Sequence, residues 1–167
     1  TDADGLDCGV FDAVILAVPS PQAETLLAPF PEVAADLATV EMMPMWTLLL
    51  GFDAPTGLPQ AIQDFSAPLL AAIPMLAKLG QRGAERWTIH AQPEWSSANL
   101  EIEKEEAAEI LLVAFRDAMK LATEPAYIAV HRWRYARVGR PLGRPFDAVA
   151  SGEAMAARIL KKRSARD

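Results

Sequence analysis

Hydrophobic and polar residues alternate along two segments in the second half of the chain. In segment 86–92 the odd positions hold Trp, Ile and Ala, while the even positions hold Arg, Thr, His and Gln. In segment 127–135 the odd positions hold Tyr, Ala, His, Trp and Tyr, and the even positions hold Ile, Val and two Arg. A period of two residues is typical of a strand that buries one face. Each segment is therefore predicted to be a strand. The two arginines are unusual for a strand that only builds a core.

Other segments show continuous apolar runs or helical spacing. The runs Phe11–Val18 and Trp46–Phe52 predict strands buried on both faces, the second one central in its sheet. A shorter strand is predicted at 60–65. The run 67–80 fits a helical face, but Pro74 would kink or end that helix, so its structure stays open. Apolar spacing and helix-starting Ser or Pro residues predict helices at 20–27 (capped by Ser20), 32–40, from Pro93, at 103–121 and from Ser151. Turns rich in Pro or Gly are predicted at 53–59, 80–83 and 139–145.

These elements predict an α+β fold. Strands and helices follow one another without a strict strand–helix–strand repeat, which favours a mixed, mainly antiparallel sheet with helices packed on one face. The 167 residues suit a single domain with a sizeable core. Within it, residues 1–40 form a strand–helix unit, and residues 41–167 form the body of sheet and helices.

Composition excludes several classes of function. A net charge of −6 and a pI near 5.0 argue against nucleic-acid binding, which needs a basic face. The basic cluster 161–166 is interpreted as cations at a helix C-terminus, with a phosphate or membrane contact as the alternative. The longest near-apolar run, 67–77, is too short to span a membrane. The single cysteine, Cys8, allows no internal disulfide, so a reducing, cytoplasmic setting is expected.

Candidate chemistry concentrates in the two alternating strands. The only histidines, His90 and His131, have no partner at metal-ligand spacing, so no metal site is predicted. Trp133 shares a strand face with His131, and we expect it to be largely buried. The aromatic residues could wall a flat pocket, or they could serve core packing alone. The two arginines could bind an anionic ligand or pair with Glu101, Glu103 or Glu105.

Four sequence motifs carry a resemblance to a known family. They are RWTIHAQPEWSSANLE at 86–101, HRWRYA at 131–136, FDAVILAVPSPQAETLL at 11–27 and SGEAMAARIL at 151–160. Together they resemble the renalase-like branch of the flavin-dependent amine oxidases, over most of the chain from Phe11 to Leu160. The resemblance implies an FAD domain joined to a mixed-sheet substrate domain, with dihydronicotinamide dinucleotides or amines as substrates. It also implies that Trp133 and Arg134 line the substrate side, with His131 and Trp87 behind them.

The chain departs from that family where FAD would bind. No GxGxxG turn occurs in the sequence, so the cradle for the pyrophosphate is missing. The family's Gly-Asp segment before the last helix is not recognisable, and an apolar stretch, 73–82, stands where the family has a polar loop facing the flavin. The N-terminus Thr-Asp-Ala-Asp has no Met and is read as an internal start.

We therefore expect the substrate-domain portion of a renalase-like flavin-dependent oxidoreductase, unable to catalyse alone. Its parent would use FAD and a small-molecule substrate, while this chain alone would bind no cofactor. The catalytic residues stay unknown. The alternative is a non-catalytic binding or oligomerisation module derived from that family. Such a module could form a homo-oligomer through an exposed former domain interface.

Overall fold

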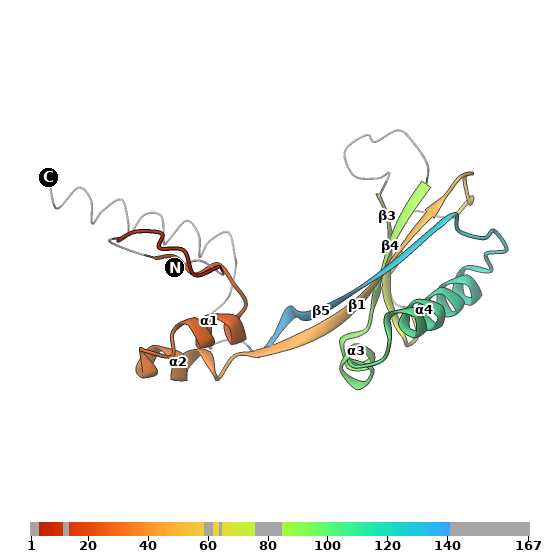
Figure 1. The fold of residues 1–167 in the computed structure, drawn as a ribbon. Helices are drawn as coiled ribbons and strands as arrows, with labels where there is room; N and C mark the ends of the chain where they lie inside the picture. The colour runs from red at the N-terminus through yellow and green to blue at the C-terminus, as the bar shows by residue number, and fades with distance from the viewer. Residues whose placement is uncertain (1–3, 12–13, 59–61, 64, 76–84, 141–167) are drawn as a thin grey trace, which may run out of the picture.

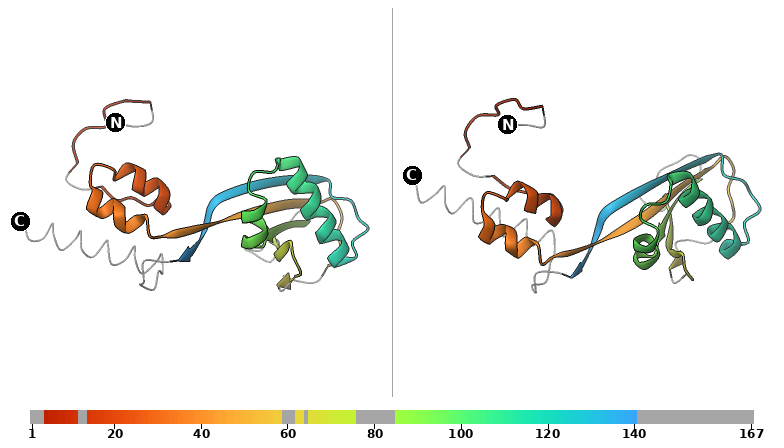
Figure 2. Two further views of the ribbon diagram at one scale, coloured as in Figure 1. Left: turned by 90° about the horizontal axis from the view of Figure 1, so that it is seen from below. Right: turned by 60° about the horizontal axis from the view of Figure 1, so that its bottom comes forward.

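The structure is a computed structural model that describes residues 4–11, 14–58, 62–63, 65–75 and 85–140. A twisted antiparallel sheet forms its body, and two helices cover that sheet on one side (Figures 1 and 2). The described elements are, in chain order, α1 (Ser20–Leu26), α2 (Pro31–Leu37), β1 (Glu41–Phe52), β2 (Ile62–Gln63), β3 (Leu69–Pro74), β4 (Glu85–Ala91), α3 (Pro93–Ala98), α4 (Lys104–Met119) and β5 (Tyr127–Arg140).

The five described strands form one sheet in the order β2-β3-β4-β1-β5. Every described pair of neighbours is antiparallel. Strand β1 lies between β4 and β5, so the predicted internal strand at 46–52 is confirmed, with bounds 41–52. Helices α3 and α4 pack against one face of this sheet (Figure 2). The predicted α+β fold, with helices on one face of an antiparallel sheet, is confirmed.

The core lies between α4 and the even-numbered residues of β1. Trp46, Leu48 and Leu50 are each at most 2% exposed, because alternation along the strand turns all three toward the helices. Leu111 and Phe115, one helical turn apart on α4, are fully buried against this layer. Burying each large side chain contributes roughly 1.5–3 kcal/mol. The remaining buried members of this core are Phe52, Leu69, Ala72, Trp87, Ile89, Ala91, Ala107 and Leu121.

Helix α3 fixes the end of the β1–β4 pairing. That pairing begins at Thr47, and the backbone N–H of Trp46, just before it, donates to Ser96 Oγ at 3.1 Å. The indole Nε1 of Trp46 donates to the carbonyl of Asn99 at 3.0 Å. Ser96 is fully buried. A helix that begins at Pro93, as predicted, therefore satisfies a backbone donor that the sheet leaves without a strand partner.

A long two-stranded ribbon of β1 and β5 extends away from the helix-covered body (Figure 1). Helices α1 and α2 lie at its far end and contact each other. Both agree with predicted helices, although Pro19, not Ser20, is the N-cap of α1 and no side chain caps that helix. Ser20 is its first helical residue because Pro21 sets the backbone angle of the first turn.

The predicted buried strand at Phe11–Val18 is wrong for its described residues. Phe11 and Val14 to Val18 form no strand, and their large side chains are between 36% and 75% exposed. A strand that is apolar on both faces needs neighbouring strands and two covering layers. None of the described strands pairs with this segment. Its large apolar side chains therefore remain exposed in the described part of the chain.

Two further predictions changed in detail. Segment 69–74 belongs to the run 67–80, whose spacing fitted a helical face interrupted by Pro74. It is strand β3, because it pairs with both β4 and β2. Helix α4 ends at Met119, and Lys120 closes it in the left-handed conformation. Of the predicted strand at 60–65, the structure describes β2 at Ile62–Gln63, and Phe65 lies outside a strand. The turn at 80–83 and the helix from Ser151 lie outside the described residues, as does most of the turn at 139–145.

None of the helices that the structure describes combines the length and the apolar character needed to cross a membrane.

The role of Ser96 can be tested by removing its hydroxyl. We expect Ser96→Ala to lower the free energy of unfolding by about 1–3 kcal/mol, because it leaves the buried N–H of Trp46 without an acceptor. The matched control is Ser97→Ala. Ser97 is exposed and its hydroxyl only donates to the carbonyl of Pro93, so its loss should cost about 0.5 kcal/mol or less. Urea unfolding of both variants measures the difference. Equal losses would contradict this role.

Candidate functional site

The face of the sheet opposite α3 and α4 carries a row of polar side chains, and we call it the open face. Thr47 on β1 pairs in register with His90 of β4 on one side and His131 of β5 on the other. Thr47 Oγ1 lies 3.1 Å from His90 Nδ1. Thr47 is only 4% exposed although no described helix covers this face. The two histidines, which are 41 positions apart in the sequence, thus flank one buried hydroxyl.

Beside this row, His131 and Trp133 form an aromatic pair. Their ring centroids are 4.2 Å apart and the rings are tilted by 59°. Trp133 is 51% exposed, so the expectation that it is largely buried is wrong. The alternation of β5 was assigned correctly, but the face that it shares with His131 is the one without helices. Tyr127 and Tyr135 on the same strand are exposed as well.

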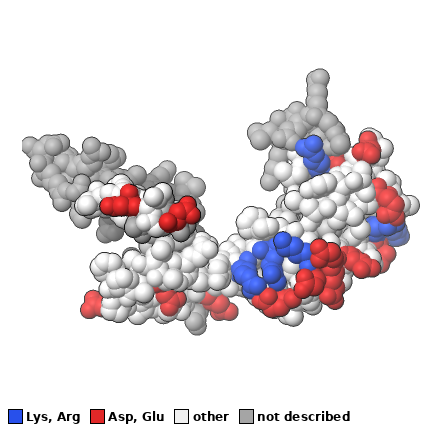
Figure 3. Space-filling view, viewed as in Figure 1, with Lys and Arg blue, Asp and Glu red and all other residues white. Residues whose placement is uncertain are grey.

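The two arginines of β5 point to the other face, where they hold the α3–α4 connection. Arg134 binds Glu101 with two hydrogen bonds, at 2.7 and 2.9 Å. Arg132 donates to the carbonyl of Leu100 at 2.6 Å and contacts Glu101 at 3.2 Å. Its guanidinium also lies 5.4 Å from the ring centre of Trp46. Figure 3 shows a basic cluster directly beside acidic side chains on the helix-covered body. The predicted ion-pair alternative, with Glu101 as the partner, is confirmed.

This ion pair also sets the electrostatics of the cluster. The hydrogen bond from Arg134 is the main reason why the pKa of Glu101 lies below its ordinary value, and the charges of Arg134 and Arg132 add to it. In return, Glu101 raises the pKa of Arg134. Both groups are solvent-exposed, so salt screens the pair and its contribution to stability is small.

Trp87 lies in the core and not beside the other site candidates. It is 1% exposed and packs against Phe115 of α4, with ring centroids 5.9 Å apart. Its Nε1 donates to Glu85 at 2.6 Å, and Glu85 also accepts the backbone N–H and the hydroxyl of Thr56. Burial raises the pKa of Glu85, but the hydrogen bonds from Thr56 and Trp87 outweigh it, so the pKa is lowered overall. The structure therefore brings together only His131 and Trp133 of the four predicted substrate-binding residues.

A hollow at one end of the open face was missed by sequence reasoning. It has a volume of about 570 Å³ and lies where β1 ends and where β4 and β5 begin. Its lining includes Leu49, Gly51, Met75, Arg86, Thr88 and Tyr127. The one sequence signal for it is Gly51, a glycine at the end of an otherwise continuous apolar run. The hollow itself depends on the register between three strands, which the sequence does not reveal.

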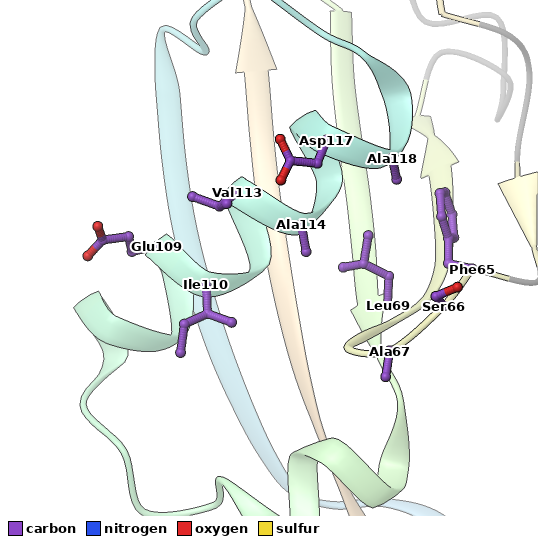
Figure 4. A pocket seen from close by; sticks show the side chains of 10 residues that line it. All are labelled: Phe65, Ser66, Ala67, Leu69, Glu109, Ile110, Val113, Ala114, Asp117 and Ala118. Carbon is purple, nitrogen blue, oxygen red and sulfur yellow. The ribbon is translucent and has the colours of Figure 1, made fainter.

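A second depression lies on the helix side of the sheet. This groove, of about 840 Å³, runs between α4 and the segment that joins β2 to β3 (Figure 4). Leu69, Val113 and Ala114 supply apolar contacts, and Glu109 and Asp117 stand on the helix beside them. No cationic side chain lines it among the described residues, so this groove has no group that would fix an anionic ligand.

The described residues do not fit a dinucleotide cradle or a metal centre. A cradle needs backbone N–H groups at a helix start, reached through glycines. At the start of α1, Pro21 has no N–H, and the N–H groups of Gln22 and Ala23 both donate to the carbonyl of Pro19. Among the described residues, no three His, Cys, Asp or Glu side chains come together as a metal site would require.

Comparison with known proteins supports the fold. No family model matches the sequence. The chain is similar to the crystal structure of a protein provisionally described as a protoporphyrinogen oxidase, from Exiguobacterium sp. 255-15. The identity is 16% and the TM-score 0.57, over 75% of this chain. It is also similar to a reduced UDP-galactopyranose mutase, with 10% identity and a TM-score of 0.50 over 71% of this chain. The matches cover 29% and 28% of those chains, so this chain spans less than a third of either. At these identities the likeness shows a shared fold.

Replacing two tryptophans distinguishes the two faces of the sheet. We expect Trp87→Ala to lower the free energy of unfolding by about 3–5 kcal/mol, because it opens a cavity in the core. Trp133→Ala should cost about 1 kcal/mol or less, because half of that side chain is already in water. Thermal and urea unfolding of both variants provide the comparison. A loss above about 3 kcal/mol for Trp133→Ala would mean that something covers the open face, which contradicts its exposure.

Proposed function

We propose that this chain is the substrate-domain portion of a renalase-like flavin-dependent oxidoreductase of the amine oxidase type. The observation that carries the proposal is the open face, where His131 and Trp133 form an exposed aromatic pair beside a buried Thr47. Aromatic and imidazole groups that are exposed on a rigid sheet suit a flat organic ligand better than solvent. The helices already bury the opposite face, so this is the surface that remains for a ligand or for a second domain.

The structural neighbours support the redox class. The Exiguobacterium protein is described as an oxidase, and the mutase structure is described as that of a reduced protein. The chain matches less than a third of each, as expected of one domain from a larger enzyme. The motifs that resemble renalase-like proteins agree with this class and narrow it to FAD and to amine or dihydronicotinamide substrates.

In this proposal the chain supplies a wall beside the flavin ring and the substrate, and not the cradle that holds the pyrophosphate of FAD. His131 and Trp133 would contact the substrate and exclude water from one side of it. Arg134 would act indirectly, because its bond to Glu101 fixes β5 against the α3–α4 connection. Trp87 would support the sheet from the core. The residues that hold FAD would come from other polypeptide, and the flavin they hold would supply the redox chemistry. The chain alone would then be inactive.

One observation favours a different function. The large apolar residues of segment 10–18 are exposed, as are Leu49 and Tyr127 on the open face. Exposed apolar surface of this kind is also expected of a non-catalytic binding or oligomerisation module. In that case the chain would associate with itself through these residues, and the aromatic pair would have no role in binding a flavin or its substrate.

A comparison of two flavins tests the proposal. FAD and lumiflavin share the isoalloxazine ring, but only FAD carries the pyrophosphate. We expect both to bind weakly and with similar affinity, because the described turn at the start of α1 cannot hold a pyrophosphate. Fluorescence titration measures the affinities, and the indole NMR signals of the protein report whether Trp133 is involved. Trp133→Ala should lower the affinity for both flavins. The control Val138→Ala, which changes another exposed residue of β5, should not.

Two results would count against the proposal. Saturable FAD binding at low micromolar concentration, much tighter than that of lumiflavin, would mean that the chain does contain a cradle. Binding of neither flavin, combined with a dimer or larger species in light scattering, would favour the oligomerisation module.

A further inference from the structure

We propose that the hollow at the end of the open face binds a planar aromatic carboxylate. This inference rests on the geometry of the hollow and does not require the proposed function. At about 570 Å³, the hollow lies in the size range of small-molecule sites. Three strands contribute to it, so its walls belong to the rigid sheet and not to a single loop.

Gly51 creates the space. In the sheet register, Gly51 of β1 pairs with Arg86 of β4 on one side and with Tyr127 of β5 on the other. Arg86 and Tyr127 therefore stand about 10 Å apart, two strand spacings, with no side chain between them. A Cβ atom at Gly51 would lie 3.2 Å from Tyr127 Cβ and 3.9 Å from Cγ of its ring. The tyrosine side chain thus covers Gly51, which is buried, and its exposed part offers an aromatic surface to the hollow.

Arg86 supplies the charge that selects an anion. It is exposed, and no described carboxylate lies within ion-pair distance of its guanidinium. This contrasts with Arg116, Arg132 and Arg134, which all have carboxylate partners. A guanidinium matches a carboxylate with two parallel hydrogen bonds. Asp53 also lines the hollow and would repel an anion at its own position, which leaves Arg86 as the place for the carboxylate.

The remaining lining favours an aromatic body over a phosphate or a sugar. Leu49 and Met75 are apolar, and Tyr127 is 60% exposed, so its ring can stack on a ligand. A phosphate dianion would need more than one cation, and Arg86 is the only one among the lining residues that the structure describes. One arginine and one aromatic ring, on either side of a residue without a side chain, therefore suit a flat ligand with a single carboxylate.

This hollow is separate from the pair of His131 and Trp133. Tyr127 precedes His131 by four residues on the same strand, a distance of about 14 Å along an extended chain. A small ligand in the hollow would therefore not touch the aromatic pair. Loss of one site would leave the other intact, so the two proposals fail independently.

Two isosteric probes test this site on the intact chain. 2-Naphthoate carries the carboxylate, and 2-naphthamide replaces it with a neutral amide of the same shape. We expect 2-naphthoate to bind saturably and more tightly than 2-naphthamide. Its NMR shifts should be confined to the end of β1 and to the starts of β4 and β5. Arg86→Gln should lower the affinity for 2-naphthoate roughly tenfold or more and leave the affinity for 2-naphthamide unchanged. Tyr127→Ala should weaken both probes because it removes the stacking surface.

Arg137→Gln is the matched control, because Arg137 is also an exposed arginine of the sheet but lies ten residues beyond Tyr127 on β5. This variant should bind 2-naphthoate like the unmodified chain. Thermal unfolding of each variant verifies that the fold is kept. The proposal is overturned if 2-naphthoate shows no saturable binding, if 2-naphthamide binds equally well, or if Arg86→Gln binds as tightly as the unmodified chain.

Discussion

The structure depends on packing that covers only one face of its sheet. Helix α4 buries Leu111 and Phe115 against the sheet layer that holds Trp46, Leu48 and Leu50, and all five residues belong to one apolar core. Because side chains alternate along β1, the same packing turns Thr47, Leu49 and Gly51 to the opposite face. No described helix covers those residues. Every candidate site on the open face, from His131 to the hollow beside Gly51, is a consequence of this asymmetry.

Polar contacts hold the strands against the helices on the covered face of the sheet. Ser96 satisfies the backbone of Trp46 where β4 ends, and Arg134 and Arg132 fasten β5 to the connection between α3 and α4. These contacts lie on the helix side or at its edge. They fix the strands without occupying the open face, so the surface that the sheet presents for binding is rigid and its side chains stay accessible. A wall of this kind suits a substrate domain that meets a second domain across a ligand.

Alternation and capping predicted the strands and helices of the body well, because those signals are local. The sequence could not say which face of β5 the helices would cover. The prediction that Trp133 is buried rests on the strand face that it shares with His131. The helices instead cover the face of Arg132 and Arg134, whose guanidinium groups reach Glu101. Segment 69–74 showed helical spacing, but strand pairing on both sides prevailed over it.

The hollow at Gly51 arises from cross-strand register, so no local pattern could reveal it. The apolar run at 11–18 shows the same limit, because its burial depends on partners outside the described strands.

The exposure of the open face is the claim on which the functional account rests. Hydroxyl-radical footprinting, with modified residues identified by mass spectrometry, measures it side chain by side chain in the unmodified protein. The account predicts that Trp133 and Tyr127 are oxidised rapidly, while Trp46 and Trp87 are protected until the protein unfolds. Protection of Trp133 and Tyr127 to the same degree as Trp46 and Trp87 would contradict it.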